Sequence, residues 1–407
     1  MNDLTLVLLA FMVFVGFTTL LSLYTKGKQI SIKGLLRLQM AVGGILIFIG
    51  RGRKALNPKP LGKGASIGLR SSIVVGMLLF YLFFVPNLIK FAGSFFNYVT
   101  QKGGPAPTPI AIPVPLLFKF TDLVPYAIIS IAIAVVAHEL MHAIVALREG
   151  ISVKSWGVGL YFLIPIAFVE LDEEEFNNAP PRSKQNVIAA GIFANALVSL
   201  IALAVALSII NLVPQVFGEP VRVVTIQEVD CESICNTSVC PAVVSGLEVN
   251  TIIESVNNTK IRSLDQLVEV LSNATLGSNL VLNICDYNGA CKEVFISLTV
   301  PRGNTSRPCI GIGFSESMGF EKNPTLYVVP WFASMMLFMD MLVSINLGLF
   351  MLNSIPLYLT DGSLFLKHIQ TKYQVIHRVF SSRMIDAINI VILVIAITLS
   401  SYLLLAG

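Results

Sequence analysis

Uninterrupted apolar runs, several of them long enough to cross a lipid bilayer, are the feature that most constrains this chain. A helix needs about 20 predominantly apolar residues to span the hydrocarbon layer. Of the 407 residues, 55% are hydrophobic and only 13% are charged, and the mean hydropathy is +0.77. Soluble domains carry about 25% charged residues. An ordinary soluble enzyme is therefore excluded, and a polytopic α-helical membrane protein is expected.

Six membrane spans are predicted, at residues 4–23, 71–96, 123–147, 186–213, 326–355 and 386–405. The positive charges near the first run follow it instead of preceding it, so this run suits a retained span and not a cleaved signal peptide. The run from Met40 to Gly50 lies between Arg37 and Arg51 and is too short to span. We expect it to lie in the interface or to dip in and out of the membrane.

Positive charge sets the expected orientation of the spans. Between Lys26 and Arg70 the chain has ten Lys or Arg residues and no acidic residue, and cytoplasmic loops carry such an excess. Alternation from this loop places residues 214–325 and both termini outside the cytoplasm. Topology and anionic headgroups are sufficient to explain the basic stretch. No nucleotide-binding loop is recognised in the sequence, and nucleic acid is not an expected partner.

The segment 214–325 differs in composition from the rest of the chain. It holds all six cysteines and four acceptor sequences for N-glycosylation, which begin at Asn236, Asn257, Asn273 and Asn304. This clustering favours an oxidising, extracytoplasmic compartment. A polar loop that is merely rich in Asn and Thr stays open as the alternative. Six cysteines allow many pairings, so no disulfide is predicted.

Short strands and one helix are expected within this external segment. The predicted elements are a turn and strand at 246–256, a capped amphipathic helix at 263–271, and a hairpin of 280–285 with 293–298 around Asn288 and Gly289. This order resembles a PDZ domain. Such a domain can accept an extended chain by strand addition or exclude substrates with large ectodomains, and an inert disulfide-braced cap is the alternative.

The pattern that carries chemistry is His138-Glu-Leu-Met-His142, at the end of the third predicted span. Histidines four residues apart project from one face of a helix, so their imidazoles can bind one Zn²⁺ while Glu139 stays free to act as a general base. The alternative to a metal site is a pair of helix-end histidines that lie near the headgroups and bind no metal. Ionisable groups at membrane depth are costly and usually functional, which favours the metal.

A catalytic zinc site needs a third protein ligand, and several residues on the same side of the membrane could supply it. The candidates are Glu170, the cluster Asp172–Glu175, Asp340, Asp361, His368 and His377. Asp361 stands out because Pro356 ends the preceding helix and Gly362 permits a sharp turn, which can aim the carboxylate back into the helix bundle.

Three motifs in this order resemble the site-2 protease family of intramembrane zinc metalloproteases. The first is the histidine pair. The second is Gly191-Ile-Phe-Ala-Asn195, similar to the family's Gly-x-x-x-Asn element. The third joins Asn353, Pro356 and Asp361-Gly362 and is similar to an Asn-x-x-Pro-x-Pro-x-Leu-Asp-Gly loop, with Tyr358 and Thr360 in place of the second Pro and the Leu.

This resemblance implies one zinc ion per chain, held by His138, His142 and Asp361, with Glu139 as general base. It implies hydrolysis of a peptide bond within the membrane helix of a single-span protein that has already been trimmed, in regulated intramembrane proteolysis. Asn195 and Asn353 could hold the substrate backbone or the oxyanion, or simply join helices. The stretches Arg37–Lys54 and Trp156–Glu170 resemble the sterol-pathway branch, and a PDZ-like insert is expected in this family.

The expected organisation is a membrane region at 1–213 with the zinc helix, an external PDZ-like domain at 214–325, and a second membrane region at 326–407. A membrane metal-ion transporter is the main alternative function. It has no need for the non-ligating Glu139 between two histidines, whereas a hydrolase does. A catalytically silent scaffold is a third reading, which the full ligand set weakens. The sequence does not indicate the oligomeric state.

Overall fold

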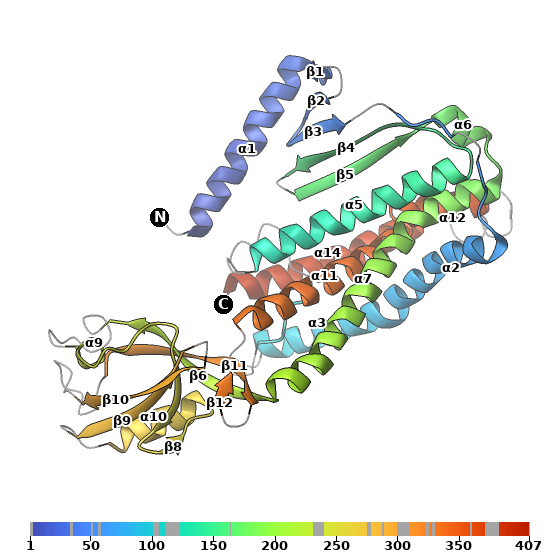
Figure 1. The fold of residues 1–407 in the computed structure, drawn as a ribbon. Helices are drawn as coiled ribbons and strands as arrows, with labels where there is room; N and C mark the ends of the chain where they lie inside the picture. The colour runs from blue at the N-terminus through green and yellow to red at the C-terminus, as the bar shows by residue number, and fades with distance from the viewer. Residues whose placement is uncertain are drawn as a thin grey trace. The chain divides into compact units, whose positions relative to one another are not determined.

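A computed structural model gives the fold (Figure 1). It describes residues 3–32, 36–49, 52–55, 58–100, 106–110, 123–162, 164–230, 240–274, 278–286, 289–298, 310–322, 325–327, 330–358, 360–370 and 382–406. His377, Asn236, Asn304 and Asn288 lie outside the described residues. The chain divides into two compact units, one formed by Met1–Leu203 with Phe338–Gly407 and the other by Ala204–Leu337.

Long apolar helices dominate the first unit. Among the described residues, five segments are long and apolar enough to cross a membrane: Lys63–Thr100, Val124–Arg148, Pro181–Phe217, Trp331–Ser354 and Met384–Leu404. They correspond to the second to sixth predicted spans. The first predicted span is helical as well, in α1 (Asp3–Thr25), but its described apolar part, Leu9–Thr25, is shorter than a full span. A sixth span therefore stays a prediction.

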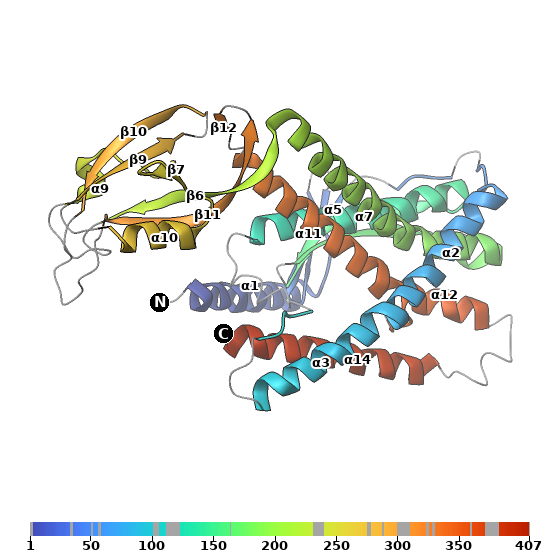
Figure 2. The same ribbon diagram turned by 90° about the horizontal axis from the view of Figure 1, so that it is seen from below.

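The helix Lys63–Thr100 contains a short π-helical segment. It consists of α2 (Lys63–Leu79), η1 (Phe80–Phe84) and α3 (Val85–Thr100). Leu88 and Phe91 of α3 pack with Ala396 and Leu403 of α14 (Ser382–Ala406), and Figure 2 shows these two helices side by side. π-Helical segments are rare and frequently lie at functional sites.

A five-stranded antiparallel sheet accompanies the helices of the first unit. Its order is β1 (Ile30–Ile32), β2 (Leu36–Ala41), β3 (Gly44–Ile49), β4 (Val153–Tyr161) and β5 (Ile164–Leu171). The strands β2 and β3 contain most of the run from Met40 to Gly50, so this run is a β-hairpin, which the sequence analysis did not foresee. Strand β5 is at the edge of the sheet, beside helix α5 (Val124–Arg148) (Figure 1).

A compact apolar core joins the helices that carry the candidate site. It contains Leu69 and Ile73 of α2, Val145 of α5, Ile192 of α7 (Pro181–Phe217), Phe350 of α11 (Pro330–Ser354) and Phe365 of α12 (Asp361–Gln370). At Gly76 of α2 a Cβ atom would overlap the side chain of Ser354. Helices α2 and α11 therefore approach closely where α11 ends.

The second unit is built on a seven-stranded antiparallel sheet. Its strands follow the order β10 (Cys291–Ser297), β9 (Asn279–Cys285), β7 (Ile252–Val256), β6 (Glu219–Val229), β11 (Ile312–Lys322) and β12 (Thr325–Tyr327), and β8 (Thr259–Lys260) pairs with β7. Helices α9 (Pro241–Val244) and α10 (Leu264–Ser272) belong to this unit, together with the end of α7 and the start of α11. Its core is aliphatic, with Ile226, Ile253, Leu267 and Leu282 essentially inaccessible.

The strand, capped helix and hairpin predicted at 246–298 are confirmed as β7, α10 and β9–β10. Ser263 caps α10 by accepting a hydrogen bond from the Gln266 amide, which satisfies one of the free N–H groups at the helix start. The residues 325–327 form a strand, so helix α11 begins at Pro330 and not at 326 as predicted. Strands β11 and β12, which precede α11 in the chain and lie at one edge of the sheet, were not predicted.

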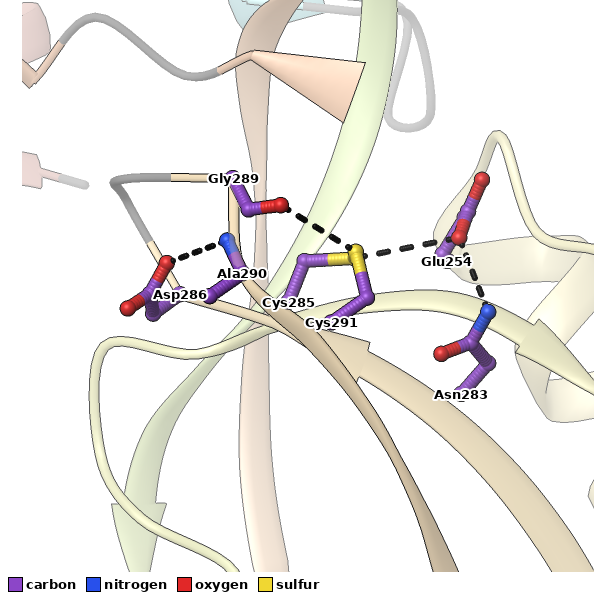
Figure 3. The surroundings of a disulfide bond; sticks show 7 residues. All are labelled: Glu254, Asn283, Cys285, Asp286, Gly289, Ala290 and Cys291. Atoms are coloured by element: carbon purple, nitrogen blue, oxygen red, sulfur yellow. Dashed lines mark hydrogen bonds between the residues drawn. A yellow bond between two sulfur atoms is a disulfide. The ribbon is translucent and has the colours of Figure 1, made fainter. Parts of the chain in front are cut away.

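The disulfide between Cys285 and Cys291 joins the two strands of the β9–β10 hairpin (Figure 3). These two residues face each other in the register of the pair. The third described cysteine, Cys240, is disulfide-bonded as well. Disulfides persist where thiols are not kept reduced, and the compartment of this segment stays a prediction.

Candidate metal centre

Helix α5 brings the histidine pair together. The helix is apolar along most of its length and has Pro125 in its first turn, where a missing N–H costs nothing. His138 and His142 are one turn apart, and their Nε2 atoms are 3.1 Å from each other. The two rings meet edge to face with centroids 4.7 Å apart. The predicted convergence of the two imidazoles is therefore present.

The carboxylate of Asp361 completes the cluster. Its Oδ2 atom is 3.1 Å from Nε2 of His138 and 3.2 Å from Nε2 of His142. The three side chains are largely buried, with exposed fractions of 12%, 13% and 17% for His138, His142 and Asp361. Asp361 Oδ2 is buried and has no hydrogen-bond partner among the described residues, which suits an oxygen that would bind a metal.

A zinc ion fits the three atoms. Zinc bonds to nitrogen and oxygen of about 2.0–2.1 Å in a tetrahedral site set the ligand atoms about 3.3–3.4 Å apart. The observed separations of 3.1–3.2 Å are close to this value. Helix α7 leaves room beside the histidines at Gly191, where a Cβ atom would overlap Nε2 of both. Three protein ligands, two histidines and one carboxylate, match the ligand pattern of catalytic zinc.

A tight turn aims Asp361 at the histidines. The Thr360 hydroxyl donates to the carbonyl of Ile355 at 2.7 Å and accepts from the amide of Leu357 at 3.1 Å. At Gly362 a Cβ atom would overlap the carbonyl of Ser354, so the turn leaves no space for a side chain there. The threonine that departs from the family loop therefore supplies hydrogen bonds that close the turn.

Helix α14 holds the same turn from outside. The Asn389 amide donates to the carbonyl of Pro356 at 2.9 Å and accepts from the Tyr81 hydroxyl at 2.9 Å. Tyr81 lies in the π-helical segment η1. Asn389 is fully buried, and buried amides are seldom left without partners. This relay was not predicted, because neither residue carries a recognisable sequence motif.

The outer ring nitrogens of the histidines also have partners. His142 Nδ1 is 2.7 Å from the carbonyl of Val187. A carbonyl only accepts, so this Nδ1 carries the proton and leaves the Nε2 lone pair free for a metal. His138 Nδ1 is 3.1 Å from the side-chain amide of Asn195. Asn195, predicted to contact substrate or the oxyanion, thus lies against the ring of a candidate ligand.

The Glu139 carboxylate contacts strand β5 of the sheet. Its Oε2 accepts a hydrogen bond of 3.0 Å from the backbone amide of Val169 on β5. Glu139 follows His138 directly in the chain, and it is not among the described residues that lie close enough to share a metal with the histidines. Because it is not one of the candidate ligands, its carboxylate is the candidate general base.

A cavity of about 440 Å³ opens beside Glu139, between α5 and the sheet. Val136, Leu140, Ala143 and Ile144 line it on the helix side, and strands β4 and β5 line it opposite. Trp156 on β4 remains 46% exposed there. The cavity is apolar apart from Glu139 and Arg53. The cavity can therefore hold apolar side chains of a bound peptide next to Glu139, the candidate general base.

The other candidate ligands lie elsewhere. Glu170 accepts from the Ser155 hydroxyl, and Asp172 caps the short helix α6 (Glu173–Asn178). Asp340 is exposed on α11, and His368 is half-buried on α12, with Nδ1 2.8 Å from the Leu364 carbonyl of the same helix. None of these four belongs to the described ligand cluster. Asp361 alone among the described candidates joins the histidines.

Asn353 is half-buried in the last turn of α11. Within the described part of the chain its side chain makes no hydrogen bond to the three ligand residues. Its predicted contact with substrate therefore stays a prediction. The hydrogen bond between Glu139 and β5 was not predicted. The alternating pattern of Trp156–Glu170, with Gly157 and Gly159, is typical of closely packed strands and could have indicated the sheet.

Comparison with known proteins agrees with this geometry. The sequence profile of Peptidase family M50 matches residues 126–399, which is well over half of the chain and contains every member of the cluster. The protein belongs to this family. Peptidase family M50 is the site-2 protease family, so the resemblance seen in the three motifs is confirmed. The sterol-pathway branch and the PDZ-like insert are not tested by this match.

A second comparison finds an uncharacterised protein of the archaeon Methanocaldococcus jannaschii, which is 40% identical over 89 residues. The match covers 21% of this chain and 24% of that protein, so the chain spans about a quarter of this relative's length. Membership of Peptidase family M50, together with the apolar helices, identifies a multi-pass integral membrane protein of a metalloprotease family. The transporter alternative is not favoured.

Proposed function

We propose that this member of Peptidase family M50 is an intramembrane zinc metalloendopeptidase that hydrolyses a peptide bond within the membrane helix of a single-span protein. The observation that carries the proposal is the convergence of His138, His142 and Asp361 beside a glutamate that is not a ligand. A transporter site would not require this glutamate. One zinc ion per chain is expected.

His138, His142 and Asp361 would hold the ion, and zinc bound there would supply Lewis acidity to the attacking water and the scissile carbonyl. Glu139 takes the proton from the attacking water and later delivers it to the leaving amine, which are the two tasks of a general acid–base group. The Val169 amide holds the Glu139 carboxylate during both tasks. The cavity beside Glu139 keeps apolar substrate side chains next to the reacting bond.

The outer edge of β5, which pairs with no strand among the described residues, can bind the substrate in an extended form. Val169 turns its amide away from β4 toward Glu139, so Ala167, two residues earlier, also directs its amide outward. Pro165, which has no N–H, lies at the next outward position, where no ladder bond is lost. Hydrolysis requires local unwinding, because a helical peptide bond is shielded and hydrogen-bonded. Substrates with Gly, Pro or Asn in the span are expected to be favoured.

The second unit supports a further part of the proposal. We infer that residues 214–325 are extracytoplasmic and PDZ-like, because their order of strands and capped helix and their disulfides suit that assignment. The catalytic residues then lie toward the cytoplasm. A size filter that admits only trimmed substrates accounts for such a domain, and Asn353 is retained as a candidate contact for the substrate backbone, since no hydrogen bond to the described ligand residues occupies its amide.

A cleavage assay with defined controls tests this function. The protein is purified in detergent, mixed with a single-span substrate that carries a helix-breaking residue, and the products are mapped by mass spectrometry. We expect a cut within the span that both a chelator and Glu139→Gln abolish. If zinc binds stoichiometrically at the three ligands and no such substrate is cut, the protease function is wrong for this chain, and metal flux in liposomes would test the transporter instead.

A further inference from the structure

We propose that Asn195 is a positioning residue for the metal centre: its side-chain oxygen accepts a hydrogen bond from Nδ1–H of His138 and thereby fixes the tautomer and ring orientation of that ligand. The inference rests on the proposed zinc site. It assigns Asn195 a task different from the substrate or oxyanion contact expected from sequence.

His142 shows what each ligand requires. Its Nε2 faces the cluster, and its Nδ1 donates to the Val187 carbonyl at 2.7 Å. A neutral imidazole has one N–H and one lone pair, so the carbonyl fixes the proton on Nδ1 and the lone pair on Nε2. Metal-bound histidines almost always donate their second nitrogen in this way to a carboxylate, carbonyl or water.

His138 has the same orientation and needs an equivalent acceptor. Its Nε2 is 3.1 Å from Oδ2 of Asp361, so Nδ1 must hold the proton when Nε2 binds metal. The group that faces this Nδ1, at 3.1 Å, is the Asn195 side-chain amide, through Nδ2. If His138 binds zinc through Nε2, its Nδ1–H and the Nδ2–H of Asn195 are two hydrogen-bond donors that face each other.

The unpaired Oδ1 atom of Asn195 can replace Nδ2 and so remove the contact between two donors. Asn195 is only 1% exposed, and its Oδ1 has no hydrogen-bond partner among the described residues. The two ends of an amide have nearly the same shape, and their assignment follows from the hydrogen bonds they make. A half-turn of the amide places Oδ1 on the Nδ1–H of His138 and gives the buried oxygen its partner.

The same geometry separates Asn195 from the reacting atoms. Nδ1 and Nε2 are on opposite sides of the imidazole ring, and Asn195 contacts the side that faces away from Asp361 and His142. A group on that side acts through His138 and does not touch an oxyanion at the metal. Asn195 is thus to His138 what the Val187 carbonyl is to His142.

Zinc affinity tests this role without reference to proteolysis. The full-length protein in detergent competes with a chromophoric chelator for zinc, and the dissociation constants of the variants are compared. Asn195→Leu should bind zinc about 10- to 100-fold more weakly, the usual effect of losing such a partner. Asn195→Asp, which only accepts, should bind at least as tightly as the parent.

The matched control is Ser199→Ala, one turn along α7, which removes the hydrogen bond from Ser199 to the Val343 carbonyl but no contact to a histidine. It should bind zinc like the parent. Affinity within twofold of the parent for Asn195→Leu, or equal losses for the Leu and Asp variants, would overturn the inference. If the Leu variant does not fold, Asn195→Ala replaces it. If His142→Ala leaves zinc binding unchanged, the zinc site itself is wrong.

Discussion

Glu139 of the zinc-motif helix is hydrogen-bonded to the backbone amide of Val169 on the edge strand β5, with Oε2 3.0 Å from the nitrogen. The bond joins the candidate general base to the candidate substrate-binding edge. A carboxylate that accepts from a backbone amide is held in one orientation. The residue that handles the proton and the strand that can present the peptide are therefore fixed relative to each other.

Replacement of Glu139 by glutamine should abolish proteolysis and spare the metal. Glutamine keeps the shape and can still accept from Val169, but it cannot take a proton from water. We expect kcat to fall by at least about 100-fold, the contribution of a general base, while zinc content measured by mass spectrometry stays at one per chain. Loss of zinc in this variant would mean that Glu139 is itself a ligand.

Proline at position 167 should weaken substrate binding at the sheet edge. The outward amide of Ala167 is lost in Ala167→Pro, whereas Ala167→Val keeps it and serves as the control. One hydrogen bond contributes about 1 kcal/mol, so kcat/KM should fall about fivefold to tenfold for the proline variant alone, with zinc affinity unchanged. Equal activity of the two variants would show that the substrate does not pair with β5.

A methyl group at Gly191 should exclude the metal. The Cβ of Gly191→Ala would overlap Nε2 of both His138 and His142, so we expect zinc to be lost and activity with it. Gly348→Ala on α11 is the control, because nothing lies within 4 Å of its Cβ and alanine favours the helix. Chelator competition on both variants checks the prediction, which fails if Gly191→Ala retains parental affinity.

The relay from Tyr81 through Asn389 should stabilise the turn before Asp361. Tyr81→Phe leaves Oδ1 of the buried Asn389 without its donor, and Asn389→Leu frees the carbonyl of Pro356. An unpaired buried polar group costs about 1–3 kcal/mol, so both variants should lower the midpoint of thermal unfolding and speed zinc release.

The control for this relay is Asn87→Leu, an exposed amide on α3 that bonds only to the Phe83 carbonyl of its own helix among the described contacts. It should release zinc at the parental rate. The relay has no role in the metal site if Tyr81→Phe and Asn389→Leu destabilise the protein but leave the rate of zinc release unchanged.

Features that depend on neighbours along the chain could be predicted from the sequence. The apolar runs of α5 and α7 follow from hydrophobic length, and the pairing of His138 with His142 follows from the helical repeat, which puts residues four apart on one face. Ser263 as a helix cap and the β9–β10 hairpin follow from equally local rules. For the third ligand, the local sequence left several candidates and favoured Asp361, and the family resemblance selected it. The approach of its carboxylate to the histidines depends on how a turn folds.

Only the tertiary structure decided the contacts between distant segments. The contact of His142 with the Val187 carbonyl has no sequence signal, because every residue has a carbonyl. The pairing of β3 with β4 has none either, because the two strands lie far apart in the chain. Side-chain period fixes which faces are apolar, while register and approach are set by packing of whole elements. The candidate metal ligands could thus be predicted from the sequence, whereas the groups that orient them were decided by the fold.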